Sequence, residues 1–93
     1  MSDVLDILKK HKKELFDKYP LESLVLFGSY SRGDFKKNSD VDVLVEFKNP
    51  VGMEFISLSH DLEDILKMKV DLVSKPAVKP KYLKYIEPDL LYV

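Results

Sequence analysis

The chain has 93 residues, of which 45% are hydrophobic and 33% are charged, and this length and composition indicate a single globular domain over residues 1–93. Fifteen basic residues nearly balance sixteen acidic residues, which argues against bulk nucleic-acid binding, and the lack of cysteine excludes disulfides and cysteine-bound zinc. There is no signal-like N-terminal stretch and no apolar run of about 18 residues, so we expect a cytoplasmic protein without a membrane span.

Residues 3–18 have the spacing of an amphipathic helix that Pro20 ends, with Ser2 or Asp3 as its N-cap. One stripe of this helix carries the following residues: Val4, Ile7, Leu8, His11 and Leu15. The lysines between them could form an RNA-binding patch, but we expect a solvated helix face, because acidic residues lie among them.

The central stretch begins with an apolar run at residues 24–27 that predicts a buried strand. Gly28 ends this strand, residues 29–32 can form a short helix closed by Gly33, and residues 34–39 form a polar loop. A second strand is expected over residues 41–47. Period-two alternation places Asp40 and Asp42 on one face of it, opposite the valines.

The second half of the chain predicts a helix over residues 53–67, a short strand over 70–73, and a helix from Pro80 that Pro88 ends, leaving residues 89–93 as a tail. The resulting order of elements indicates an α/β (α+β) domain, with three strands in a small sheet flanked by helices. Strand directions cannot be read from the pattern. Tyr82, Tyr85 and Tyr92 are expected to pack on the domain's own core; a partner-binding surface is the alternative.

The central stretch also contains groups suited to nucleotidyl transfer, which needs a grip on a triphosphate, divalent cations and removal of a proton from an acceptor hydroxyl. Gly28 lets the backbone approach a phosphate, and Ser29 offers a hydroxyl and a backbone N–H at a helix start. Arg32 is the only arginine in the chain and is suited to phosphate recognition. The alternative for Arg32 is an ordinary surface ion pair with Asp34 or Asp40.

Acidic side chains supply the candidate metal ligands. Asp40 and Asp42 point the same way from one strand, as oxygen ligands of Mg²⁺ would. Asp71 is the expected third carboxylate, because it stands between apolar residues where an unpaired charge would be costly. It could instead be a strand-end aspartate that reaches solvent. The rivals for the third position are less suitable by placement: Glu46, Glu63 and Asp64.

These residues closely resemble the polymerase-β-like nucleotidyltransferase superfamily, whose signature is a Gly-Ser turn followed at this spacing by Asp-x-Asp, here Gly28-Ser29 and Asp40-Val-Asp42. The length and the segment from Gly28 to Gly33 are most similar to its minimal branch, which includes the MntA-type antitoxins that partner HEPN-domain toxins. The resemblance implies the nucleotidyltransferase fold, a small mixed sheet flanked by helices. It also implies that Asp40, Asp42 and Asp71 hold two Mg²⁺ ions, and that Asp71 helps to deprotonate the acceptor.

By the same resemblance, Gly28 and Ser29 would hold the triphosphate of ATP, and Arg32 is a further candidate for phosphate contact. The implied activity is transfer of AMP from ATP to a tyrosine hydroxyl of a HEPN-type toxin, which would silence that toxin. Two alternatives stay open, namely a non-catalytic antitoxin that acts by binding and nucleotidyl transfer to a small molecule or nucleic acid. The sequence does not specify the base, the acceptor or the oligomeric state.

Overall fold

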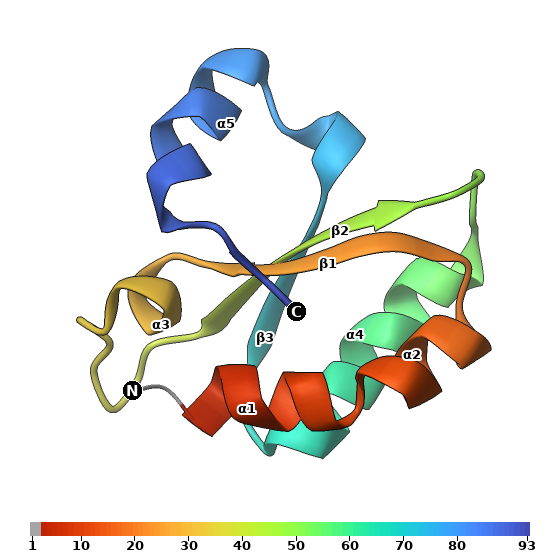
Figure 1. Ribbon diagram of the computed structural model, residues 1–93, viewed down its shortest axis with the longest axis horizontal. Coiled ribbons are helices and arrows are strands. Elements are labelled where there is room, and N and C mark those ends of the chain that lie inside the picture. The colour runs from red at the N-terminus through yellow and green to blue at the C-terminus, as the bar shows by residue number, and fades with distance from the viewer. Residues whose placement is uncertain (1–2) are drawn as a thin grey trace.

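The computed structural model describes residues 3–93, apart from the side chain of Asp3. The elements are, in chain order, α1 (Asp3–Lys10), α2 (Lys12–Lys18), β1 (Leu21–Phe27), α3 (Ser29–Arg32), β2 (Val41–Phe47), α4 (Met53–Leu66), β3 (Val70–Ser74), η1 (Lys75–Ala77), α5 (Pro80–Ile86), η2 (Glu87–Asp89) and β4 (Leu91–Tyr92), where η denotes a 3₁₀-helix. The expected α/β architecture is confirmed, with helices on both sides of one sheet (Figure 1).

The sheet is mixed and has the strand order β3-β2-β1-β4. Strand β1 runs antiparallel to both β2 and β4, whereas β2 and β3 are parallel. The expectation of three strands is wrong, because residues 3–93 form four: the tail contributes β4, which pairs Leu26 with Leu91 and Val25 with Tyr92. A two-residue strand is too short to show an alternating pattern, and its pairing depends on backbone groups that carry no sequence signal.

The sheet separates two apolar layers (Figure 1). The larger layer joins α1, α2 and α4 to one face of the sheet, and its β2 members are Val41, Val43 and Val45. The smaller layer joins α5, through Ile86, to the other face, where Leu44 is buried. The alternation expected for residues 41–47 is therefore confirmed. Asp42, with Leu44, points to the face that α5 covers.

The first helical stretch is interrupted. Residues 3–18 form two helices, α1 and α2, that meet at His11, whose ring Nδ1 lies 2.9 Å from the carbonyl oxygen of Ile7. The stripe still faces the core, because Val4, Leu8 and Leu15 are buried. The expected N-caps, Ser2 and the side chain of Asp3, lie outside the described residues. No helix within residues 3–93 combines the length and the apolar character that a bilayer crossing requires.

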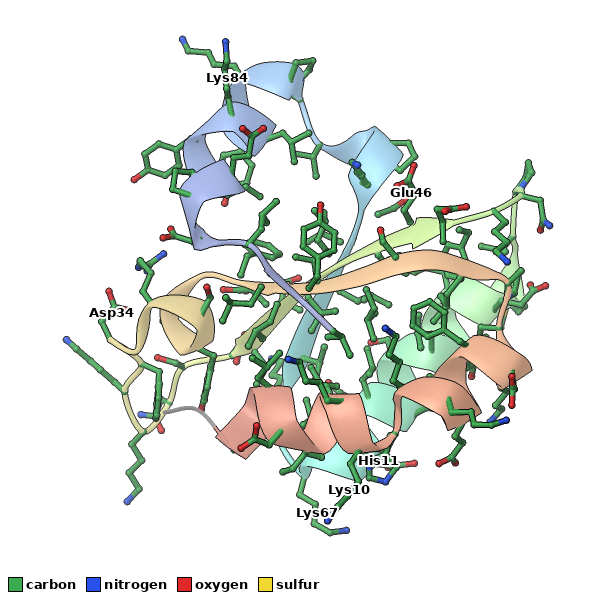
Figure 2. The ribbon with its side chains drawn as sticks, in the orientation of Figure 1. Lys10, His11, Asp34, Glu46, Lys67 and Lys84 are labelled. Atoms are coloured by element: carbon green, nitrogen blue, oxygen red, sulfur yellow. The ribbon has the colours of Figure 1, made fainter. Side chains whose placement is uncertain are left out.

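The C-terminal tyrosines do not pack as expected. Tyr82, Tyr85 and Tyr92 keep 51%, 79% and 60% of their surface exposed, so the expectation that they join the core is wrong. The reason is helical periodicity: Leu83 and Ile86 occupy the inward face of α5 and leave Tyr82 and Tyr85 on the outer face. Lys84 also points away from the body of the molecule (Figure 2).

Candidate active site

The turn after β1 is built on Gly28. Its backbone has a φ of +75°, which residues with a side chain rarely adopt, and it directly precedes the short helix α3. A methyl group at this position would overlap with Oδ2 of Asp42 and lie 3.1 Å from its Cγ. Glycine is therefore required here both by conformation and by the close approach of a β2 carboxylate.

Asp42 and Asp71 lie next to each other on neighbouring strands. They are direct partners in the parallel register of β2 and β3, and partners in such a register point to the same face of the sheet. Asp40 precedes β2 by one residue and stands two positions before Asp42. Asp42 also faces the last residue of β1, Phe27, in the antiparallel register. By register, the positions of the three predicted acidic residues and the Gly28 turn thus lie at the same end of the sheet.

The three carboxylates differ in exposure, and Asp42 is affected by the other two. Asp42 is half-buried, whereas Asp40 and Asp71 are exposed. Burial raises the pKa of the Asp42 carboxyl, and the negative charges of Asp71 and Asp40 raise it further, while the positive charge of Arg32 opposes the shift. Positive charge placed beside Asp42 would oppose this shift.

Asp71 is not in the buried environment that the sequence predicts. The pattern of β3 indicated a buried strand, yet β3 is an edge of the sheet and Asp71 is open to solvent. The aspartate therefore carries no desolvation cost that would demand a partner. Its position opposite Asp42, and not its burial, makes it the candidate for the third carboxylate.

The alternatives for the third carboxylate have other roles. Glu63, on α4, accepts a hydrogen bond of 3.0 Å from the backbone N–H of Val70 through Oε2 and so fixes the start of β3. Glu46 forms an ion pair with Lys75, 3.4 Å between Oε1 and Nζ, near the far end of β2 from the Gly28 turn (Figure 2). Asp64 is exposed on α4.

Oxygen donors suit Mg²⁺, and the mutual repulsion at Asp42 is what a cation would relieve. Within residues 3–93, however, no three acidic or histidine side chains already converge as a closed metal cage. This is compatible with Mg²⁺, which is usually bound by one or two carboxylates together with substrate phosphates and waters. The residues present therefore fit a cation that arrives with a nucleotide better than a resident structural metal.

Arg32 forms ion pairs on two sides. Its Nε donates to Oδ2 of Asp34 at 3.0 Å and its Nη1 to Oδ2 of Asp89 at 3.4 Å. The sequence left open a surface ion pair of Arg32 with Asp34 or Asp40. The pair with Asp34 is present, and no pair with Asp40 is found within residues 3–93. The positive charge of Arg32 nevertheless acts on Asp42, where it lowers the pKa of the carboxyl. Asp89 was missed by the sequence analysis, since it lies 57 residues away in a segment interpreted as a tail.

The model of the nucleotidyltransferase domain family matches residues 8–92. The chain belongs to this family. The expectation of a nucleotidyltransferase enzyme is confirmed at this level, and the Gly28 turn and the aspartates on β2 lie inside the matched region.

Two relatives of this nucleotidyltransferase align over its whole length. A protein of Methanocaldococcus jannaschii, provisionally named a protein adenylyltransferase, is 48% identical over 95 residues, covering 100% of this chain and 97% of the relative. Protein adenylyltransferase MntA of Thermococcus cleftensis is 39% identical over 94 residues, covering 100% of this chain and 95% of the relative.

Solved structures share the fold. A protein provisionally described as a minimal nucleotidyltransferase superposes with a TM-score of 0.79 at 24% identity, over 100% of this chain and 97% of that one. A complex of a tri-AMPylated HEPN toxin and MNT antitoxin from Shewanella oneidensis gives a TM-score of 0.70 at 24% identity. The match covers 96% of this chain and 70% of that one. A toxin-antitoxin crystal structure with AMP-PNP gives a TM-score of 0.74 at 24% identity, covering 90% of this chain and 70% of that one.

Proposed function

We propose that this nucleotidyltransferase transfers AMP from ATP to a hydroxyl, that of a tyrosine, on a HEPN-type partner protein, and thereby acts as an antitoxin. The observation that carries the proposal is the pairing of Asp42 with Asp71 across β2 and β3, beside the Gly28 turn. The Thermococcus relative named as a protein adenylyltransferase supports the choice of a protein acceptor. The toxin-antitoxin complexes of like fold support the class of partner.

The chemistry is a displacement at the α-phosphorus of ATP. The acceptor oxygen forms a new bond to this phosphorus, the bond to the bridging oxygen of the β-phosphate breaks, and pyrophosphate leaves. The proton of the acceptor hydroxyl passes to the exposed carboxylate of Asp71. The Gly28–Ser29 turn holds the triphosphate, with Ser29 offering its hydroxyl and Arg32 its remaining N–H groups.

Asp40, Asp42 and Asp71 would hold the Mg²⁺ that enters with ATP, two ions in the arrangement that the resemblance implies. When bound, Mg²⁺ neutralises charge on the triphosphate and stabilises the attacking and leaving oxygens. Asp42, which is half-buried between Gly28 and Asp71, fixes the ligand cluster relative to the phosphate-binding turn.

The direct test is to incubate the protein with Mg²⁺, a HEPN-type protein encoded beside it, and ATP labelled on either the α- or the γ-phosphate. Adenylyl transfer attaches label to the partner only from the α-labelled nucleotide, because the γ-phosphate leaves with pyrophosphate. Transfer from γ-labelled ATP would mean phosphorylation and would contradict the proposal. Efficient labelling of tRNA or an aminoglycoside without a partner protein would favour the other acceptor classes.

A second candidate is a binding antitoxin whose catalytic site is idle, and the outer face of α5 favours it. Tyr82 and Tyr85 are exposed there beside Lys79, Lys81 and Lys84, which form no ion pair within residues 3–93. If binding alone silences the toxin, neutralisation in cells would survive the double change Asp40→Asn/Asp42→Asn but not the change of the exposed Tyr82 and Tyr85 to alanine, which spares the core and β4. Loss of neutralisation in the double variant, with the complex still formed, would exclude this candidate.

A further inference from the structure

The turn η2 contacts the phosphate-binding helix from the far end of the chain. The hydroxyl of Ser31 donates a hydrogen bond to the backbone carbonyl of Asp89, and Nη1 of Arg32 donates to the Asp89 carboxylate at 3.4 Å. These contacts join α3 to a segment 57 and 58 residues later in the sequence. Two adjacent residues of α3 are thus both held by one residue of η2.

The two carboxylates bound to Arg32 occupy different edges of its guanidinium. Asp34 accepts from Nε, at the root of the group, and Asp89 accepts from Nη1. A guanidinium has five N–H donors in a fixed plane, so three remain, and no further hydrogen bond from Arg32 is found within residues 3–93. A guanidinium held at two edges rotates less freely, and its three remaining N–H groups stay available for a ligand.

Asp34 and Asp89 differ in how firmly they can hold the guanidinium of Arg32. The side chain of Asp34 is 60% exposed on the loop that follows α3, at the outer edge of the molecule (Figure 2). The side chain of Asp89 is only 29% exposed, and its backbone is anchored by Ser31. Asp34 forms the shorter bond, 3.0 Å against 3.4 Å, but its exposed side chain can move away with the loop, whereas Asp89 is shielded and anchored. Asp89 is therefore the partner that ties the guanidinium to a fixed point of the fold, because water and mobility weaken surface pairs.

We infer that Asp89 is a positioning residue for nucleotide binding: it holds the guanidinium of Arg32 beside the Gly28–Ser29 turn, so that the free N–H groups meet the triphosphate. This inference rests on the proposed function, in which Arg32 contacts phosphate. Preorganisation of this kind improves binding by reducing the motion that the ligand must freeze. The C-terminal segment, which contains no residue of the Asp-x-Asp signature, thereby belongs to the nucleotide site.

The test is a calorimetric titration of ATP in the presence of Mg²⁺, with steady-state kinetics of AMP transfer. Four variants are compared with the wild type: Asp89→Ala, the control Glu87→Ala in the same turn, Arg32→Ala, and the double change of Arg32 and Asp89 to alanine. Asp89→Ala should weaken ATP binding about two- to fivefold, the range of a partly exposed ion pair, and raise KM equally with kcat unchanged. Glu87→Ala should match the wild type.

The decisive comparison is the variant pair in the Arg32→Ala background. If Asp89 acts through Arg32, removing Asp89 has no further effect there, because the two residues form one unit. A loss of ATP affinity that persists in this background, or an equal loss in Glu87→Ala, would overturn the inference. A kcat effect without a KM effect would also overturn it. If the wild type itself binds no ATP, the proposed function fails, a result distinct from these.

Discussion

Gly28 and Asp42 are so close that the absence of a side chain at one residue makes room for the carboxylate of the other. A Cβ on Gly28 would overlap with Oδ2 of Asp42 and lie 3.1 Å and 3.3 Å from its Cγ and Cβ. The turn proposed to hold phosphate and the carboxylate proposed to hold metal are therefore in direct contact. This contact connects the two parts of the signature, which are separated by the loop after α3.

Replacing Gly28 by alanine should therefore damage activity more than stability. Backbone strain at positive φ should lower the free energy of unfolding by about 1–2 kcal/mol, and displacement of Asp42 should reduce AMP transfer by at least about tenfold. The matched control is Gly33→Ala, which has a φ of +86° and no neighbouring atom within 4 Å. It should show the strain in denaturant unfolding and keep most of its activity. Equal loss of activity in both variants would contradict this account.

A hydrogen-bonded carboxylate joins α2 to α4. Oδ2 of Asp61 accepts from the hydroxyl of Tyr19 at 2.5 Å and from Nζ of Lys18 at 2.8 Å. These bonds hold the pKa of Asp61 below its usual value of 3.8, and burial together with the same carboxylate raises the pKa of the Tyr19 phenol. Asp61→Asn should lower the free energy of unfolding at neutral pH by about 1 kcal/mol.

The stabilisation contributed by Asp61 should depend on pH, because its pKa is lower in the folded protein than in the unfolded chain. Asp61 is protonated more readily in the unfolded chain, so its stabilisation is complete above the unfolded pKa and is lost as the pH falls through the folded one. Urea unfolding at about pH 7 and in acid below the usual pKa of 3.8 should show that the stability difference between Asp61→Asn and wild type becomes smaller as the pH falls. Asp17→Asn, which breaks a highly exposed ion pair with Lys13, should change stability by less than about 0.5 kcal/mol. A difference that grows in acid would refute the assignment.

Mg²⁺ with a non-hydrolysable ATP analogue should stabilise the wild type against heat, by about 2.7 kcal/mol at a ligand concentration of a hundred times Kd. Asp71→Asn should reduce this shift strongly, because it removes one carboxylate of the cluster. Without ligand it should not destabilise the protein, since it removes a negative charge that repels Asp42. Asp64→Asn, at an exposed site on α4, is the control and should retain the full shift. A full shift in Asp71→Asn would exclude Asp71 from the metal site.

The two faces of α5 should respond differently to substitution. Ile86 is 5% exposed in the smaller apolar layer, and Ile86→Ala should cost about 2–4 kcal/mol of stability. Tyr85 is 79% exposed, and Tyr85→Ala should change stability by less than about 0.5 kcal/mol. Chemical denaturation measures the change in the free energy of unfolding for both variants. A large loss in Tyr85→Ala would mean that the tyrosine packs on the domain after all.

Much of the site could be predicted from the sequence because local rules determine it. Alternation along β2 placed Asp42 on the face opposite Val41 and Val43, and the turn at Gly28 followed from glycine's access to positive φ. The position of Asp71 opposite Asp42 depends on the parallel register of β3. Strand direction is set by tertiary packing, so the sequence could nominate Asp71 from its apolar neighbours and from the family resemblance but could not give this register.

What could not be predicted arises from contacts between distant segments. Strand β4 and the contacts of Asp89 with α3 depend on where the last residues return to the sheet, and a tail of five residues has no periodicity to reveal that path. The tyrosines were assigned to the core because aromatic residues are usually buried. Leu83 and Ile86 fill the inward face of α5 instead, and the lysines nearby keep the outer face in water.

The most direct test of the central claim measures the label transferred from α-labelled ATP to the HEPN-type partner by wild type, Asp42→Asn and Glu46→Gln. Glu46 lies on the same strand and the same face, paired with Lys75, and controls for the loss of one negative charge. The account predicts that Asp42→Asn lowers the rate by orders of magnitude, whereas Glu46→Gln retains it. Undiminished transfer by a correctly folded Asp42→Asn variant would contradict the account.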